Sequence, residues 1–205
     1  MKLVDRLICE LDHALRTIAA PASALRISPA MAMDADEERN VEASRLMRVN
    51  HCGELCAQAL YRGQALVAQS DEIRTVLEDA AQEERDHLAW CQQRIEELGG
   101  RTSILNPAWY AASFCLGVAS GALGDKWSMG FLVETERQVE RHLEDHLSEL
   151  PTSDNRSRAV LATMLEDEIR HGESGEAHGA VPLPAAVKVA MKFTSKLMTR
   201  STYWV

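Results

Sequence analysis

The sequence lacks three signals that would place the chain in other classes of protein. Almost no segment alternates polar and apolar residues with period two, so we do not expect a protein built on β-sheets. Lysine and arginine number 22 against 31 acidic residues, and the net charge of -9 repels phosphate backbones, which argues against a nucleic-acid partner. No Gly-x-Gly-x-x-Gly motif follows a strand, so we expect no resident nicotinamide or flavin domain.

The cysteines and the N-terminus indicate the compartment. The chain has five cysteines, an odd number, and charged residues interrupt the apolar pattern of its first 12 positions, so no secretory leader is expected. We therefore expect a reducing, cytoplasmic setting. Cys52 and Cys56 lie one helical turn apart, but no second cysteine pair with zinc-type spacing completes four ligands. Buried thiols are favoured over a thiophilic metal site at this pair.

Apolar residues recur at helical intervals, which predicts an all-α protein. The length of 205 residues suits one domain, 1–205, and we expect its metal-binding core at about 37–180. An N-terminal amphipathic helix begins at Leu3 and ends before Pro21. The further helices are expected at about 35–69, 71–98, 106–150 and 156–177, followed by a short amphipathic helix after Pro184. Gly117, Gly121 and Gly124 are expected to interrupt the helix over 106–150.

Two helical hairpins repeat one spacing of glutamate and histidine. In each hairpin a glutamate lies about as far before the turn as a Glu-x-x-His lies after it, 30 positions on in the first case and 32 in the second. Because a helix rises about 1.5 Å per residue, equal arms bring these groups to one height. The residues are Glu54, Glu84 and His87 in the first hairpin and Glu136, Glu168 and His171 in the second.

Two such hairpins would converge four carboxylates and two imidazoles inside a helical bundle. Like charges cannot stay ionised in an apolar core without compensation, and two divalent iron or manganese ions supply it. The arrangement is that of ferritin-like di-metal carboxylate bundles. Glu83 and Asp167 point away from this face and could hydrogen-bond a ligand imidazole. Glu134 is a rival of Glu136, but only Glu136 matches the geometry of the first hairpin.

Three segments resemble the Coq7 family of demethoxyubiquinone hydroxylases, which use a di-iron centre in ubiquinone biosynthesis. They read "MRVNHCGELCAQALYRGQ", "EERDHLAWCQQRIEELGGRTSILNPAWY" and "LEDEIRHGESGEAHGA", and the similarity covers about residues 43–180. The resemblance implies a ferritin-like four-helix bundle with two iron ions per chain. Its implied iron ligands are Glu54, Glu84, His87, Glu136, Glu168 and His171.

The third metal-binding helix departs from the family pattern. The family often carries Glu-x6-Tyr there with a histidine just before the tyrosine, and this register places His142 at the histidine and Leu143 at the tyrosine. Tyr61, seven residues after Glu54, keeps the equivalent tyrosine in the first hairpin. Tyr61 and His142 are thus candidate catalytic residues. For Tyr61, a hydrogen bond near the metals and an ordinary place in the core remain open alternatives.

The family's activity implies a monooxygenase that hydroxylates the ring of a polyprenylated demethoxyubiquinol, with O₂ and an external reductant. Such a substrate suggests a peripheral enzyme on the cytoplasmic face of the cell membrane, as a homo-oligomer or within a ubiquinone-biosynthesis complex. The uncharged stretch 107–124 is too short and too mildly apolar for a span. Trp109, Tyr110 and Trp127 beside it suit a membrane interface, as does the lysine-bearing helix after Pro184, although close helix packing also explains the small residues of the stretch.

Two other functions remain as alternatives. A ferritin-like ferroxidase or a manganese catalase would use the same ligands with different access. A metal-free helical scaffold would instead pair these carboxylates with arginines such as Arg85 and Arg170.

Overall fold

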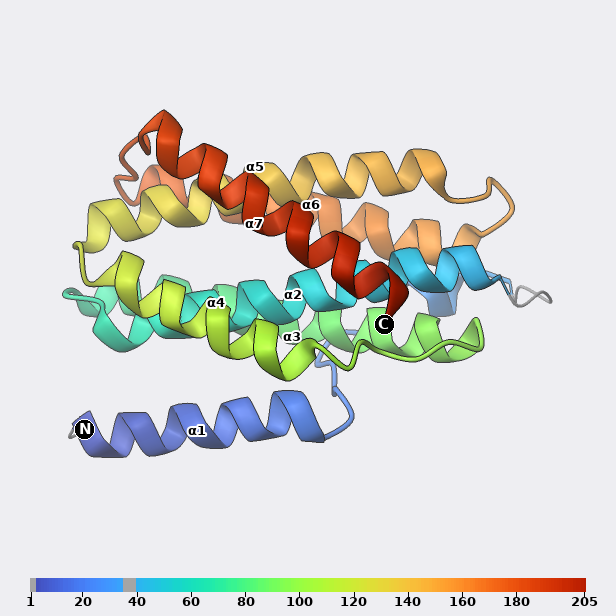
Figure 1. Ribbon diagram of the computed structural model, residues 1–205, viewed down its shortest axis with the longest axis horizontal. Coiled ribbons are helices and arrows are strands. Elements are labelled where there is room, and N and C mark those ends of the chain that lie inside the picture. The colour runs from blue at the N-terminus through green and yellow to red at the C-terminus, as the bar shows by residue number, and fades with distance from the viewer. Residues whose placement is uncertain (1–2, 35–39) are drawn as a thin grey trace.

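The computed structural model describes residues 3–34 and 40–205, and all regular elements of these residues are helices (Figure 1). In chain order they are α1 (Leu3–Ala19), the 3-10 turn η1 (Pro29–Ala32), α2 (Val41–Val67), α3 (Asp71–Glu97), α4 (Asn106–Gly121), α5 (Asp125–Glu149), α6 (Asn155–Ala177) and α7 (Ala185–Trp204).

Two antiparallel hairpins, α2 with α3 and α5 with α6, form a four-helix bundle. Figure 1 shows the three remaining helices outside it: α1 lies apart along one side, α4 runs beside α2, and α7 crosses over the bundle diagonally. Asn40, Ser70 and Asp154 start α2, α3 and α6 by accepting hydrogen bonds from the first free backbone N–H groups. The expected all-α, ferritin-like bundle with added terminal helices is confirmed.

Buried apolar side chains form separate clusters toward the two ends of the bundle. One cluster contains Leu77, Met129 and Leu132, and another contains Met47 and Leu161. The charged residues of the hairpins lie between these clusters along the helices. Water-excluding layers on both sides therefore enclose a polar middle layer.

The structure defines three of the expected helix boundaries more closely. The interruption expected within 106–150 is present at Gly121 and Gly124, where the chain turns and Gly124 takes a positive φ of 107°, so this segment is two helices. Gly117 lies inside α4 and does not interrupt it. The predicted start near Ala35 falls on 35–39, outside the described residues, and α2 begins at Val41. The C-terminal helix is not short, since α7 has 20 residues.

Candidate metal centre

The bundle brings the six residues of the two hairpins together in its middle layer. α2 and α5 each supply one glutamate, and α3 and α6 each supply a glutamate and a histidine three residues apart, which project from one helical face. None of the six residues is more than 7% exposed. The residues are Glu54, Glu84, His87, Glu136, Glu168 and His171.

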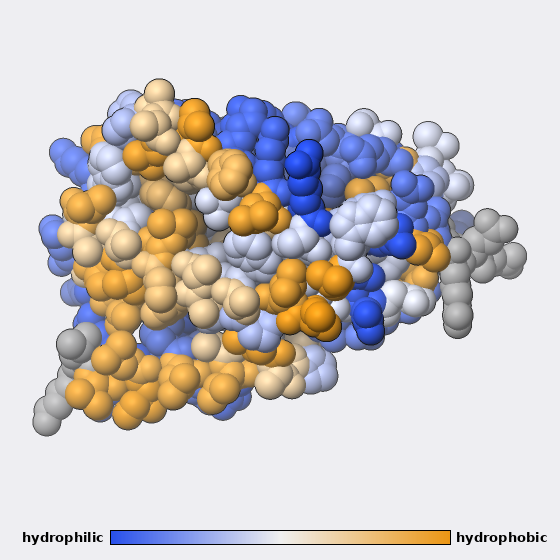
Figure 2. All heavy atoms as spheres, in the orientation of Figure 1, coloured by the Kyte–Doolittle hydropathy of each residue, from blue (hydrophilic) through white to orange (hydrophobic). Residues whose placement is uncertain are grey.

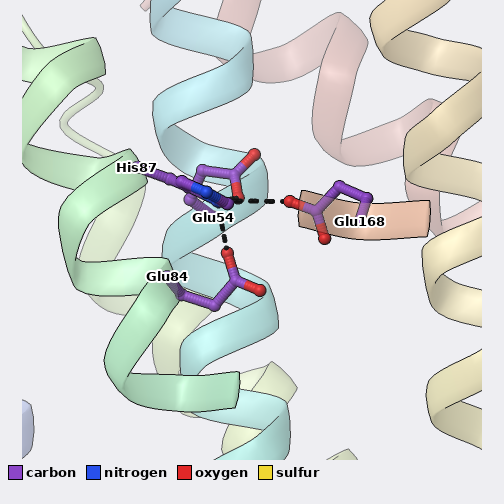
Figure 3. Close-up of side chains that lie close together, drawn as sticks. All are labelled: Glu54, Glu84, His87 and Glu168. Atoms are coloured by element: carbon purple, nitrogen blue, oxygen red, sulfur yellow. Dashed lines mark hydrogen bonds and ion pairs between the residues drawn. The ribbon is translucent and has the colours of Figure 1, made fainter. Parts of the chain in front are cut away.

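The six side chains form two overlapping clusters, within each of which the donor atoms lie no more than 4.8 Å apart. One cluster joins Glu54 and His87 to two further glutamates, and Figure 3 shows these carboxylates turned toward the His87 ring. The other joins Glu136 and His171 to the same two glutamates. These shared residues, Glu84 and Glu168, come from the two Glu-x-x-His segments. Two ions placed in the clusters would therefore have two carboxylates in common.

Both histidines present Nδ1 to the cluster and Nε2 to an outer carboxylate. His87 Nε2 lies 2.9 Å from Asp167, and His171 Nε2 lies 3.2 Å from Glu83. A proton on Nε2 donates to the carboxylate and leaves Nδ1 as the atom that can bind a metal. The predicted contacts of Asp167 and Glu83 with the imidazoles are thus present, and they orient both rings.

Without a metal, the cluster balances its charge by binding protons. Burial, together with the charges of Glu84 and Glu168, raises the pKa of Glu54 well above its usual value, and Glu136 is shifted in the same direction for the same reasons. Burial opposes a charge on His171, but hydrogen bonds to Glu168 and Glu83 outweigh it and raise its pKa to about 11. Metal binding would displace these protons.

The residues fit two divalent metal ions. Buried oxygens of three glutamates lack a hydrogen-bond donor: Glu84 Oε1, Glu136 Oε2 and Glu168 Oε1. The four glutamates, once ionised, carry a charge equal and opposite to that of two divalent cations. Carboxylate oxygens with a few imidazoles suit iron or manganese, and no cysteine belongs to either cluster.

The predicted rivals and pairs of these glutamates lie elsewhere. Glu134 accepts hydrogen bonds from Lys188 and Gln138, not from the cluster. Arg85 hydrogen-bonds Gln82, and Arg170 pairs with Glu83 and Asp167. The two arginines of the metal-free scaffold alternative thus contact other residues and not the four central glutamates.

Tyr61 is fully buried, and its hydroxyl donates to Glu136 Oε1 at 2.5 Å. Both alternatives for this residue are present, because its hydroxyl bonds beside the cluster while its ring belongs to a buried apolar cluster. Its partner belongs to the opposite hairpin, not to the Glu54 helix. Leu143, at the position where the family often has a second tyrosine, is fully buried in an apolar cluster.

An apolar cavity of about 140 Å³ lies between α2, α4, α5 and α7 and reaches Glu54. Leu60, Trp109 and Met198 contribute to its apolar wall. Its polar groups include His142, whose Nε2 has no hydrogen-bond partner, and Asn50. Burial lowers the pKa of His142 to about 4, so its ring is neutral near pH 7. The cavity connects an apolar surface to one end of the carboxylate cluster.

Arg26 is a site residue that the sequence does not indicate. It precedes the bundle, yet its guanidinium contacts Asp86 and Asp167, the second of which holds His87. Nothing in the spacing around Arg26 marks it, because the contact joins segments about 60 and 140 positions apart.

Two of the aromatic residues predicted to flank a membrane interface contact the protein itself. Tyr110 is 3% exposed, and Trp127 is partly buried against the core. Close helix packing accounts for one face of α4, since Gly117 and Gly121 are buried. Leu116 on another face is exposed, and contact of that face with lipid stays a prediction.

Comparisons with known proteins agree on one family. The family described as "Ubiquinone biosynthesis protein COQ7" matches residues 41–202. A 3-demethoxyubiquinol 3-hydroxylase from Nitrosomonas europaea is 55% identical, covering 98% of this chain and 99% of the relative. One of the same name from Chromobacterium violaceum is also 55% identical, covering 99% and 100%.

A solved structure supports the fold. The bacterioferritin-related protein from Bacteroides fragilis, described as a dodecameric thioferritin, has a TM-score of 0.60 at 19% identity, covering 77% of this chain and 92% of that one. This likeness bears on the fold alone. With the family match over residues 41–202 and relatives 55% identical along nearly the whole chain, this protein belongs to the COQ7 family of ubiquinone biosynthesis proteins.

Proposed function

We propose that this protein is a 3-demethoxyubiquinol 3-hydroxylase, a di-iron monooxygenase that adds one oxygen atom from O₂ to the ring of a polyprenylated demethoxyubiquinol. The observation that carries the proposal is the pair of overlapping glutamate and histidine clusters at the end of an apolar cavity. The relatives named for this activity support it.

The side chains of the centre would hold two irons between them. When bound, the irons would activate O₂. Glu84 and Glu168 would bind both ions, because they belong to both clusters. Glu54 and His87 would complete one ion, and Glu136 and His171 the other. Tyr61 restricts the orientation of Glu136 through its hydrogen bond, which makes it a candidate catalytic residue.

The cavity would hold the quinol ring close to Glu54. Its apolar walls accept an aromatic ring and exclude water from the cluster. At its polar side, the unpartnered His142 Nε2 can hydrogen-bond a ring oxygen and orient the carbon that is hydroxylated. His142 would thus act on the substrate and not as a metal ligand. An external reductant supplies the two electrons of each turnover.

A peripheral place at the cytoplasmic face of the cell membrane would bring the polyprenyl substrate to this cavity. None of the described helices is both long and apolar enough to cross a membrane. Figure 2 shows apolar side chains gathered along α1 and over the neighbouring face of the molecule. On α1 they include Ile8 and Leu11, each 62% exposed, and on α7 Phe193, which is 69% exposed.

Basic residues on α7 complement this apolar surface. The helix has no acidic residue and carries a cation at every fourth position from Lys188 to Arg200, so the cations follow one stripe. A helix that joins such a stripe to exposed apolar residues suits the surface of anionic lipids. The membrane would then lie against the helices that border the cavity.

Metal analysis of variants tests the proposed ligands. We expect about two irons per chain in the wild type, almost none in Glu84→Ala or Glu168→Ala, and about one in Glu54→Ala or Glu136→Ala, because only the first pair is shared. Glu134→Ala is the matched control and should keep both irons. Unchanged iron content in Glu84→Ala and Glu168→Ala would contradict the proposed centre.

Expression in a strain that lacks the hydroxylation step tests the activity. Restored ubiquinone is the expected result. Accumulation of the demethoxy precursor despite iron-loaded protein would refute the proposal, and O₂-dependent iron oxidation without a hydroxylated product would favour the ferroxidase alternative.

Flotation with vesicles tests the membrane surface. The double variant Lys192→Glu/Lys196→Glu should bind phosphatidylglycerol vesicles at least about 30-fold more weakly than the wild type, at about 1 kcal/mol for each lost cation. Arg137→Glu/Arg141→Glu on α5 changes the net charge equally and should retain binding. Equal losses in both variants would contradict a specific role for α7.

A further inference from the structure

We infer that Arg26, in the segment between α1 and η1, is a positioning residue that supports one half of the metal centre and makes the two halves unequal. The inference rests on the proposed di-metal centre. The His87 half contains Glu54 and His87, and the His171 half contains Glu136 and His171.

Arg26 contacts two carboxylates on different helices of the bundle. Its Nε donates to Asp86 Oδ2 at 2.9 Å, and its Nη1 lies 2.8 Å from Asp167 Oδ2. The same oxygen of Asp167 accepts from His87 Nε2. Arg26 therefore acts on His87 through Asp167, and its Nη2 also lies 3.4 Å from His87 Nε2. The guanidinium ties α3 to α6 directly behind that ring. A planar guanidinium suits this double contact, which a single ammonium group cannot reproduce.

The backbone around Arg26 is fixed to the same place. The N–H of Leu25 donates to Asp86 Oδ1 at 2.6 Å, and the indole of Trp90 donates to the carbonyl of Arg26 at 3.3 Å. The guanidinium also lies over the Trp90 ring, 4.8 Å from its centroid. Because these bonds come from both backbone and side chain, the segment holds the guanidinium in one position.

The His171 half has a weaker counterpart. Its outer carboxylate is Glu83, whose side chain is 36% exposed, and Arg170 behind it is 54% exposed. In the His87 half, Asp167 is only 5% exposed and Arg26 is 37% exposed. Arg170 also contacts Asp167, at 2.8 Å, so this buried carboxylate has two arginines. Exposed ion pairs stabilise little, whereas a buried carboxylate held by arginine fixes the ring and its tautomer. The N-terminal segment therefore supports the His87 half and gives it the tighter metal binding.

Manganese titration of the metal-free full-length protein tests this inference, with bound Mn²⁺ counted by electron paramagnetic resonance. The wild type should fill two sites in separate steps, and His87→Gln and His171→Gln identify which step belongs to which half. We expect Arg26→Gln to weaken the His87 step about 10- to 100-fold and to change the other less than about threefold. Arg26→Lys should give an intermediate loss.

Arg62→Gln is the matched control. Arg62 binds Glu10 with two hydrogen bonds and thus ties α1 to α2, without touching Asp167. It should loosen the N-terminal region but leave both manganese steps unchanged. An Arg26→Gln variant that weakens neither step, both steps equally, or only the His171 step would overturn the inference. A wild type that binds no Mn²⁺ would instead overturn the proposed centre, and the inference with it.

Discussion

A methyl group added at Gly117 tests how closely α4 packs against α2, where it forms one wall of the cavity. A Cβ built on Gly117 would lie 2.1 Å from the carbonyl oxygen of Leu60 and 3.1 Å from the Cα of Gly63. Both atoms belong to the backbone of α2, so no side chain can turn aside. In Gly117→Ala the two helices must therefore separate locally by about 1 Å.

The expected loss of stability follows from two opposing effects. Overpacking a close contact lowers the free energy of unfolding by about 1–3 kcal/mol. Because the added methyl group meets a backbone atom, which cannot turn aside, we expect a loss at the upper end of this range. Alanine in place of glycine inside a helix raises the free energy of unfolding by about 1 kcal/mol, because alanine has the higher helix propensity. We expect Gly117→Ala to lower the free energy of unfolding by about 2 kcal/mol, measured by urea denaturation of the metal-free protein.

Gly53 in α2 is the matched control, because a Cβ there would meet nothing within 4 Å. Gly53→Ala should raise the free energy of unfolding by about 0.5–1 kcal/mol, since only the helix preference changes. If Gly117→Ala is as stable as the wild type or more stable, the close contact between α4 and α2 would be refuted.

Two further predictions concern buried polar groups. Tyr61→Phe removes the donor to Glu136, so unfolding of the metal-free protein in urea should require about 1–2 kcal/mol less, and an unchanged value would contradict the bond. Burial lowers the pKa of His51 from its ordinary value of 6.5 to about 4. Between pH 6.5 and pH 4 the unfolded chain therefore binds more protons at His51 than the folded chain does, so the free energy of unfolding falls as the pH falls. His51→Gln should therefore lose about 2 kcal/mol less unfolding free energy than the wild type between pH 7.5 and pH 5, and equal losses in urea titrations would exclude this cause.

Local regularities of the helix made part of this protein predictable from sequence. Side chains three positions apart share a helical face, and equal arms of a hairpin end at equal heights, because the rise and turn per residue are constant. These rules are sufficient to bring Glu54, Glu84 and His87 together, and the second hairpin repeats them. The contacts of Glu83 and Asp167 with the histidines follow from the same rules.

Contacts between segments that lie far apart in the sequence decided the features that spacing does not predict. Spacing within one hairpin does not state which side chains meet across the bundle, so the sharing of Glu84 and Glu168 and the bond from Tyr61 to Glu136 could not be predicted from it. The packing of α4 against α2 likewise joins segments that no local pattern relates. Arg26 reaches the centre through a segment without helical period, and such contacts between distant segments exist only in the folded chain.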